Sequence, residues 1–408
     1  MKKILLTTII VLLAVALNAQ VSVWDGTAEP WTKGSGTPDD PYLIESAQNF
    51  AYLAEKTNEY YYGEDFRIIY VDTCFLLTVN LDLGADQGYM WNPVANNGNI
   101  SHSVSFGGHF DGGNHSISNI TMSNQMVEYF GVFGHIVNGS LKNIIIDGDD
   151  IHIPNISSIF GGCTGIILGF GINVTVENCV NNANIICDAI SMSSLECILG
   201  GMFGSMIHST ILNCHNYGDI TATNELMMYS GLYCGGVAAF LRACEMNNCS
   251  NYGDVYIMGP ESEACSRFVN SGGIAGFATG TIANCNNNGD MYLDLSVGEY
   301  TNLKVIGGIV GHTSSDYGGQ LIVTNCYCIS ELNLVGDMYP SWGGGILGSV
   351  GGSIPVSIEN SYYAGSRILT DYTGGIVAIA NNSTTIDNCY YLNTIESGND
   401  YGTPKSED

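Results

Sequence analysis

The segment HFDGGNH, residues 109–115, places three side chains that could do chemistry close together in the chain. His109, Asp111 and His115 are residue types that bind transition metals or act as an acid–base pair. The same letters also describe a tight turn, because Asp, Gly and Asn are residues that turns favour. We interpret 111–114 as a turn flanked by histidines, with a metal site as the alternative.

A second candidate is a set of carboxylates at one position of a repeat. Asp219, Asp254 and Asp290 each follow a glycine. Carboxylate oxygens are ligands that Ca²⁺ accepts readily, but the sequence lacks the dense Gly-Gly-x-Gly-x-Asp nonapeptides of calcium-binding repeats. We interpret these residues as a solvated acidic strip, with Ca²⁺ as the alternative. No catalytic, cofactor-binding or metal-binding residue is assigned, and no other cofactor is expected.

Signatures of common enzyme classes are absent from the sequence. There is no Gly-x-Ser-x-Gly elbow, no phosphate-binding loop and no zincin motif. Lyases of acidic polysaccharides place Arg or Lys beside clustered acids. Outside the first twenty residues the basic side chains recur at no consistent repeat position: Lys33, Lys56, Arg67, Lys142, Arg242, Arg267, Lys304, Arg367 and Lys405. A glycosidase requires only two carboxylates, so a carbohydrate-active enzyme (polysaccharide lyase or glycoside hydrolase) stays open as the alternative to a non-catalytic protein.

The first twenty residues have the parts of a secretory signal peptide. Lys2 and Lys3 give a positive start, an apolar stretch follows over 4–17, and Ala19-Gln20 offers a cleavage site. The apolar run is too short to span a bilayer, and polar sequence follows it. We therefore expect 1–20 to be removed and the mature chain to act outside the cytoplasm, extracellularly or at the cell surface, without a membrane span.

Charge and composition narrow the class of partner and fold. Removing the predicted signal leaves nine basic residues against 39 acidic ones. Such a chain repels phosphates and anionic headgroups, which argues against nucleic acid and membrane surfaces as partners. Hydrophobic residues make up 45% of the sequence and charged residues only 12%, with 52 glycines. A chain so poor in Lys and Glu and so rich in Gly favours strands and tight turns over helices.

An Asn-Cys pair recurs along most of the chain. The asparagines lie 35, 35, 36, 41, 35 and 28 residues apart, and these pairs begin at Asn178, Asn213, Asn248, Asn284, Asn325, Asn360 (followed by Ser361 instead of Cys) and Asn388. Asn143 lies a further 35 residues upstream. A double-glycine motif keeps the same register, beginning at Gly200, Gly235, Gly272, Gly307, Gly344 and Gly374. A fixed period of this size indicates stacked units that bury their apolar faces against one another.

Each repeat has short stretches of alternating apolar residues broken by Gly and Asn. We predict an all-β, right-handed parallel β-helix of about 35-residue coils, with three short strands per coil. A propeller has a similar period but needs four antiparallel strands per blade, and three of the four tryptophans lie before residue 92. The propeller is therefore the less favoured fold.

Stacking alone gives the repeated residues a physical role. Asn tolerates the left-handed backbone of a sharp corner and can bond the Asn of the next coil. The Cys that follows is small and is predicted to point into the interior, with Cys249 between Cys214 and Cys285. Parallel Cβ vectors in such a stack fit the disulfide dihedral poorly, so we expect buried free thiols among the 14 cysteines.

The repeats resemble a known family. GGIAGFATGTIANCNNNGDM and GGMFGSMIHSTILNCHNYGDI, with GSGTPDDPYLIESAQNFAYLAE near the N-terminus, are similar to GLUG-motif repeat proteins of bacterial surfaces and secretions. The likeness runs from Trp31 to the tail. Ala239 and Ala378 replace a closing glycine, and TGIILGFGINVTVENC lacks the double glycine. The resemblance implies a pectin-lyase-like β-helix and a surface role, including adhesion, without specifying an activity.

The chain is divided into four predicted parts. These are the signal peptide at 1–20, an N-terminal lead-in at 21–105, the β-helix at 106–395 and a flexible tail at 396–408. Within the lead-in, apolar residues at helical spacing and a capping serine predict a helix over Ser46–Asn58. Such a helix could cover the open end of the first coil.

Tyrosines gather just after the corner asparagines, at Tyr217, Tyr252, Tyr327, Tyr362, Tyr363, Tyr390 and Tyr391. An exposed row of tyrosines would suit adhesion to an extracellular glycan or a host or cell-surface protein. Rings that pack against one another along the outside of the coils are the alternative. We predict a secreted or surface-exposed, non-catalytic binding protein such as an adhesin.

Overall fold

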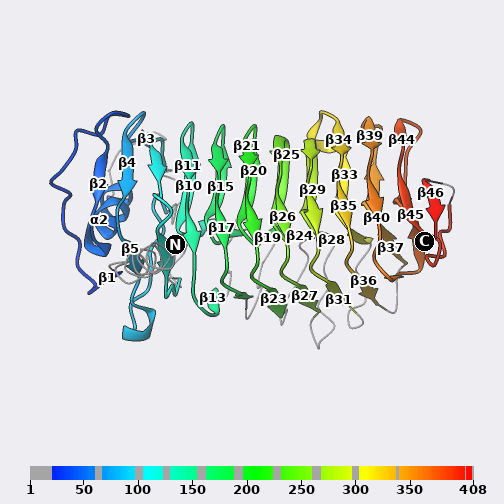
Figure 1. The fold of residues 1–408 in the computed structure, drawn as a ribbon, viewed down its shortest axis with the longest axis horizontal. Helices are drawn as coiled ribbons and strands as arrows, with labels where there is room; N and C mark the ends of the chain where they lie inside the picture. The colour runs from blue at the N-terminus through cyan, green and yellow to red at the C-terminus, as the bar shows by residue number, and fades with distance from the viewer. Residues whose placement is uncertain are drawn as a thin grey trace, which may run out of the picture.

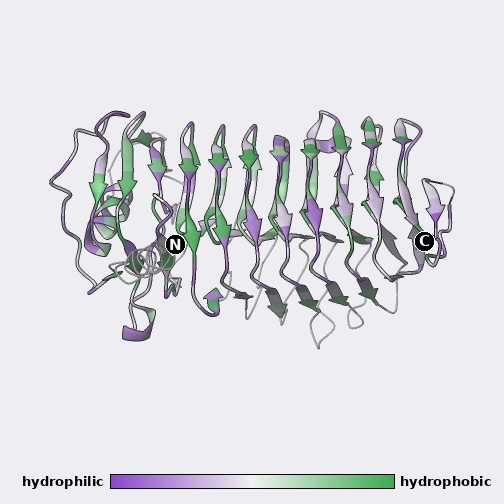
Figure 2. Cartoon of the chain, in the orientation of Figure 1, coloured by the Kyte–Doolittle hydropathy of each residue, from purple (hydrophilic) through white to green (hydrophobic). Residues whose placement is uncertain are grey.

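The chain folds into a parallel β-solenoid, a row of stacked coils with β1 and β46 at opposite ends (Figure 1). The computed structural model describes residues 21–59, 67–96, 104–122, 129–153, 162–187, 196–223, 231–259, 268–295, 303–336, 340–399 and 401–406. The predicted signal peptide lies outside these residues. Every strand pair in the ladders is parallel, which confirms the predicted parallel β-helix class. Figure 2 shows hydrophobic residues along the strands of the whole row.

Two sheets hold the residues discussed most below. The 12-stranded sheet contains β1 (Val21–Val23), β5 (Asn80–Asp82), β8 (Ser116–Ser118), β12 (Ile145–Ile146), β17 (Val180–Asn181), β22 (His215–Asn216), β26 (Ser250–Asn251), β30 (Asn286–Asn287), β35 (Tyr327–Cys328), β40 (Tyr362–Tyr363), β45 (Tyr390–Leu392) and β46 (Thr403–Lys405). The 8-stranded sheet contains β9 (Tyr129–Phe130), β14 (Cys163–Gly165), β19 (Cys197–Gly200), β24 (Gly231–Gly235), β28 (Phe268–Gly272), β32 (Leu303–Gly307), β37 (Ser341–Gly344) and β42 (Tyr372–Gly374).

Two further sheets complete the wall. The 7-stranded sheet contains β13 (Ile151–Ile153), β18 (Ile185–Cys187), β23 (Ile220–Thr223), β27 (Val255–Met258), β31 (Met291–Asp294), β36 (Leu332–Val335) and β41 (Ile368–Leu369). The 19-stranded sheet contains β2 (Tyr42–Ile44), β3 (Arg67–Ile69), β4 (Cys74–Leu77), β6 (Val104–Phe106), β7 (His109–Asp111), β10 (Phe133–Val137), β11 (Ser140–Lys142), β15 (Leu168–Ile172), β16 (Thr175–Glu177), β20 (Phe203–Ile207), β21 (Thr210–Leu212), β25 (Ala238–Asn247), β29 (Ala275–Ala283), β33 (Val310–Ser314), β34 (Leu321–Thr324), β38 (Leu347–Gly351), β39 (Val356–Glu359), β43 (Val377–Ile379) and β44 (Thr384–Asp387).

A regular coil has more strands than the three predicted. The coil from β19 to β23 contains five, because its passage through the 19-stranded sheet is bent into β20 and β21. The bend occurs at a second corner whose residues also have positive φ: Asn138, Asn173, His208, Ala243 and Gly280. This corner escaped prediction because its residue type changes from coil to coil.

The Asn corner is formed as predicted. The eight asparagines from Asn143 to Asn388 named above have φ between 50° and 55°. Their side-chain amides connect successive coils: Nδ2 of Asn213 donates to Oδ1 of Asn178 at 3.0 Å, and Asn248 donates to Asn213 at 2.7 Å. At Asn284 the acceptor changes to Asn247, where the interval between the asparagines grows to 36 residues.

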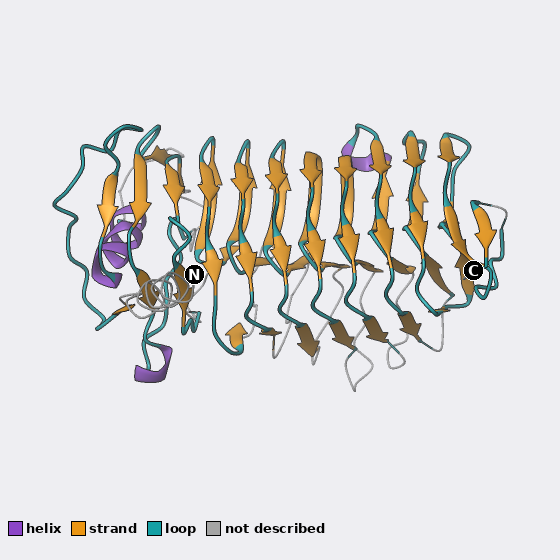
Figure 3. Cartoon of the chain, in the orientation of Figure 1, coloured by secondary structure: helices purple, strands orange, loops and turns teal. Residues whose placement is uncertain are grey.

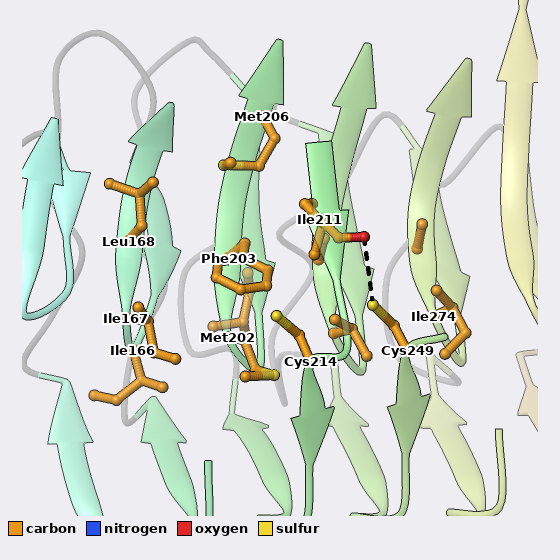
Figure 4. Packing of buried hydrophobic residues seen from close by; sticks show 14 of the residues in the cluster. Ile166, Ile167, Leu168, Met202, Phe203, Met206, Ile211, Cys214, Cys249 and Ile274 are labelled. Carbon is orange, nitrogen blue, oxygen red and sulfur yellow. Dashed lines mark hydrogen bonds between the residues drawn. The ribbon is translucent and has the colours of Figure 1, made fainter. Parts of the chain in front are cut away.

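The ladder cysteines point into the interior, as predicted. Cys214, Cys249 and Cys285 are fully buried. Figure 4 shows the first two among buried hydrophobic side chains. Each thiol donates to the carbonyl two residues earlier in the chain, and Ser361 makes the same bond with its hydroxyl. No disulfide joins any of the cysteines within the described ranges. Burial raises the pKa of the Cys214 and Cys285 thiols well above the usual value.

A second interior ladder, made of asparagines, was not predicted. Asn181, Asn216, Asn251 and Asn287 are completely buried, and each Nδ2 donates both to a carbonyl in its own coil and to the next side chain. The amide-to-amide distances are 2.8, 2.9 and 2.8 Å, and Ser330 accepts the last bond at 2.9 Å. Buried amides are tolerated here because every donor has an acceptor.

The double glycine is needed because the backbone passes very close to itself. A Cβ on Gly200 would lie 1.9 Å from the carbonyl oxygen of Phe203, and one on Gly201 would lie 2.1 Å from that of Gly236. No side chain fits at such distances. The motif therefore marks the sharp turn from the 8-stranded into the 19-stranded sheet.

The predicted N-terminal helix is confirmed. Helix α2 spans Ala47–Asn58, and Oγ of Ser46 accepts from the Asn49 amide at 3.1 Å (Figure 3). Phe50 stacks on the buried Trp91 with ring centroids 4.9 Å apart, so the helix packs into the aromatic interior of the first coils. Two short 3-10 turns, η1 (Ala85–Gln87) and η2 (Ser315–Tyr317), lie in connections.

The structure differs from the predicted partition at two points. The division after residue 105 falls within β6, and the lead-in strands pair directly with the sheets of the solenoid. Part of the tail predicted as flexible forms β46, which pairs with β45. None of the described helices is long and apolar enough to cross a membrane.

Candidate binding surface

The HFDGGNH segment forms a turn whose polar side chains have separate partners. Gly113 and Asn114 have positive φ. Asp111 accepts from Asn143 and is 3.2 Å from the Lys142 ammonium. Hydrogen bonding to Asn143 and the charge of Lys142 outweigh partial burial, so the pKa of Asp111 is lowered.

The two histidines of this segment bond elsewhere. Nδ1 of His109 lies 2.8 Å from the Ser140 hydroxyl, and Nδ1 of His115 lies 3.1 Å from Asn80. Within the described residues, no group of three or more His, Cys, Asp or Glu side chains is arranged to hold a metal ion. These three side chains therefore bond to residues of neighbouring coils.

The repeated aspartates form a continuous strip along the solenoid. Oδ1 of Asp219 accepts the backbone N–H of Asp254 at 2.8 Å, and Oδ1 of Asp254 accepts that of Asp290 at 2.7 Å. Asp290 in turn accepts the N–H of Glu331. One oxygen of each aspartate thus ties adjacent coils together. We call Asp219, Asp254, Asp290 and Glu331 the acidic strip.

Tyrosines with exposed or half-buried side chains lie along the 12-stranded sheet and directly after its strands. Tyr217 and Tyr252 follow β22 and β26 and come two residues before Asp219 and Asp254. Tyr217 and Tyr252 are 50% and 40% exposed, and their rings stack at 4.7 Å with an interplanar angle of 3°. Tyr327 and Tyr362 form a second stack at 5.2 Å and 6°, with Tyr362 43% exposed. Tyr390 continues the second column, and the Lys405 ammonium lies 4.9 Å from its ring centroid. We call these five residues the tyrosine face.

The tyrosine face consists of two columns, not one. Tyr217 and Tyr252 lie four residues after their corner asparagines, whereas Tyr327, Tyr362 and Tyr390 lie two residues after theirs. Exposure alternates from half-buried His215 through buried Asn216 to exposed Tyr217, so Tyr217 points to the same side as the position two residues earlier, where the second column lies. The rings thus pack on one another along the outside of the coils, as the second alternative has it, and Tyr217, Tyr252 and Tyr362 are each at least 40% exposed.

Ring stacking determines which kinds of contact the tyrosine face can make with a partner. Face-to-face rings direct their π-faces along the solenoid axis, toward one another. Where two rings stack, their edges and hydroxyl groups are the parts that can face solvent. Such a surface suits hydrogen bonding and edge contacts with a protein better than the face-on stacking that sugar rings require.

Two of the clustered tyrosines are not part of this surface. Tyr363 and Tyr391 are 1% and 8% exposed and point into the interior. Tyr363 occupies the place of the interior asparagines, and its hydroxyl donates to the carbonyls of Ser330 and Arg367. Strand alternation explains the difference, because each follows an outward-facing tyrosine directly.

A further ring pair was missed from the sequence. Trp342 and Tyr372 stack at 5.9 Å and 16° on β37 and β42. Each lies two residues before a double glycine, so alignment of the glycine motifs could have revealed the pair. The contact of Lys405 with Tyr390 has no such signal, because it depends on how β46 folds back.

Comparisons with known proteins find sequence matches to parts of two much longer proteins. No family model matches the sequence. The chain is 33% identical over 157 residues to a "Putative Gly-rich membrane protein" of Evansella cellulosilytica, and 24% identical over 200 residues to halomucin of Haloquadratum walsbyi. These matches cover 38% and 45% of this chain but span only 17% and 2% of the two relatives.

Among solved structures, the fold is similar to a "putative immunoglobulin A1 protease" of Bacteroides ovatus. The TM-score is 0.40 at 18% identity, with 92% of this chain and 87% of the other covered.

Proposed function

We propose that this chain is an exported, non-catalytic repeat protein of the GLUG type that acts at the cell surface or outside the cell. In this proposal, the tyrosine face and the acidic strip bind a basic surface of a partner protein. The observation that carries the proposal is the pair of stacked, solvent-exposed tyrosine columns beside a row of carboxylates.

Surface chemistry supports a basic protein partner. Tyrosine is enriched at protein interfaces because it combines a large apolar ring with a hydroxyl and loses little conformational entropy. The acidic strip and the formal charge of −28 for the whole chain favour association with positive charge. The two sequence relatives, described as a membrane protein and a halomucin, fit a surface location.

The proposal is tested with the mature chain, residues 21–408, on an array of purified secreted and cell-surface proteins of differing charge. The test variant replaces Tyr217, Tyr252 and Tyr362 with Ser. The matched control replaces Tyr292 and Tyr372, which are 38% and 57% exposed on two other sheets and have no hydrogen bond to the acidic strip among the described residues. We expect saturable binding to at least one basic protein, weakened roughly tenfold or more in the test variant and falling with salt.

Three results would overturn the proposal. They are the absence of saturable binding to every protein, an equal loss in the control variant, and release of reducing ends from a panel of polysaccharides. The last result would replace the binding role with a carbohydrate-active enzyme.

A further inference from the structure

A pocket of about 490 Å³ lies at the C-terminal end of the solenoid, apart from the tyrosine face. It is bounded by the segment that carries β41 and β42 and by the loop at 394–399 that follows β45. Its volume lies within the range usual for small-ligand sites.

The walls of the pocket are held by hydrogen bonds. Gly398 donates its N–H to the Thr373 carbonyl at 2.7 Å, and Nδ2 of Asn399 donates to the Val377 and Ala378 carbonyls. The loop is thereby fixed to the last coil. A ligand would meet a formed site and would not have to order it.

An aromatic ring that stacks on another ring through only one face lines this pocket. Tyr372 stacks on Trp342 through one face, and β42 is the last strand of the 8-stranded sheet. No further strand of that sheet follows in the described residues. The loop at 394–399, which bonds to Thr373 and Gly375, lies next to β42 instead, and it lines the pocket together with Tyr372. Tyr372 is 57% exposed. Tyr217 of the tyrosine face also stacks through one face, but Tyr372 in addition lines a pocket.

Acidic and basic side chains line the same pocket as Tyr372. Oδ2 of Asp371 accepts from the amide and the hydroxyl of Ser341, at 2.8 and 3.0 Å, which fixes the carboxylate. Arg367 and Glu396 also line the pocket and are exposed. The carboxylates can accept bonds from hydroxyl groups, and the guanidinium can donate to them.

We propose that this pocket binds a neutral sugar residue of a glycan, stacked on the face of the Tyr372 ring that is turned away from Trp342. A sugar ring has one apolar face for stacking and hydroxyl groups around its rim. Two carboxylates against one guanidinium leave the pocket negative, which disfavours uronates and other anionic sugars. The proposal goes beyond the proposed function, because it assigns a second site with a different ligand class.

The test is calorimetric titration of the mature chain with neutral oligosaccharides: cello-, malto-, manno- and galacto-hexaoses, with oligogalacturonate as the anionic comparison. We expect saturable binding of at least one neutral oligosaccharide in preference to oligogalacturonate. Tyr372→Ala should weaken it roughly tenfold or more, while Tyr372→Phe keeps most of it, because the ring and not the hydroxyl stacks. Glu396→Gln, which leaves the ring stack intact, should also weaken binding.

The matched control is Tyr217→Ala, a tyrosine of similar exposure on another sheet. It should leave saccharide binding unchanged. Absence of binding to all four neutral oligosaccharides, an equal loss in Tyr217→Ala, or preference for oligogalacturonate would overturn the proposal. Because the proposed function is read from protein binding by the tyrosine face, either proposal can fail without the other.

Discussion

The inward-facing and outward-facing residues of the coils are under different structural constraints. On the inner side, the place after the corner asparagine, directly before each strand of the 12-stranded sheet, holds Ile in one coil, Cys in six and Ser in one. On the outer side, the column that begins with Tyr217 and Tyr252 continues with Asn288, Ile329 and Ala364. Inner residues must match the volume and hydrogen bonds of the coils above and below. Outward-facing residues need only be compatible with a β-strand, so packing does not fix their identity and a binding role can.

The largest expected effect is a charge placed on the inner side. Cys249→Asp buries a carboxylate among aliphatic groups and should lower the free energy of unfolding by on the order of 3–5 kcal/mol. Because coils support one another, the damage should spread to neighbouring repeats. Chemical denaturation measures the loss, and hydrogen exchange locates it.

The control for this change is Cys249→Ser. It should be far milder, because Ser361 already fills the equivalent place and makes the same hydrogen bond to the carbonyl two residues back. An aspartate variant as stable as the wild type would show that the inner and outer sides do not differ as described.

A buried histidine of the 19-stranded sheet sharpens the comparison. His135 is 4% exposed, contacts the rings of Tyr129 and Phe170, and lies 2.8 Å from the Ser105 hydroxyl. Burial lowers its pKa to about 4 from an ordinary 6.5. The unfolded chain therefore binds more protons than the folded chain between these values, and stability is lost as the pH falls through this window.

We expect His135 to contribute roughly 3 kcal/mol of this acid sensitivity, at about 1.4 kcal/mol for each pH unit. The measurement is the unfolding free energy of the wild type and of His135→Gln from pH 7.5 to pH 4. The difference between the two proteins should shrink as the pH falls. A constant difference would contradict the assigned burial of the imidazole.

A smaller effect is expected within the interior asparagine ladder. Asn251→Ala removes the donor to Asn287 and Gly253 and the acceptor for Asn216. Leaving these groups without partners should cost about 2 kcal/mol. Tyr252→Ala, at the next residue but on the outer side, should cost less than about 1 kcal/mol. Equal losses in thermal unfolding would remove the distinction between the two sides.

The sequence was most informative where a residue is required by the backbone. The positive φ of the corner asparagines and the close approach at the double glycine leave few substitutes, so their spacing predicted the coil and its register. The helix at Ser46 was predictable because its cap and apolar spacing are local.

Features that depend on several coils at once were harder to predict. The second corner varies among Asn, His, Ala and Gly, since several residues can adopt its conformation. Tyr363 was grouped with the surface tyrosines because composition does not distinguish the two sides of a strand. The pocket beside Tyr372 arises from where the 8-stranded sheet ends and from the fold of 394–399, neither of which has a local signal.

The division between the two sides of the wall can be measured directly by labelling the native protein with thiol- and tyrosine-specific reagents and mapping the products by mass spectrometry. Tyr362 and Tyr363 are adjacent in the chain but 43% and 1% exposed, so they form an internal control. We predict rapid modification of Tyr217, Tyr252 and Tyr362. Tyr363, Cys214, Cys249 and Cys285 should react only after unfolding. Modification of Tyr363 or of these cysteines in the native protein as fast as that of Tyr362 would contradict the register assigned to every coil.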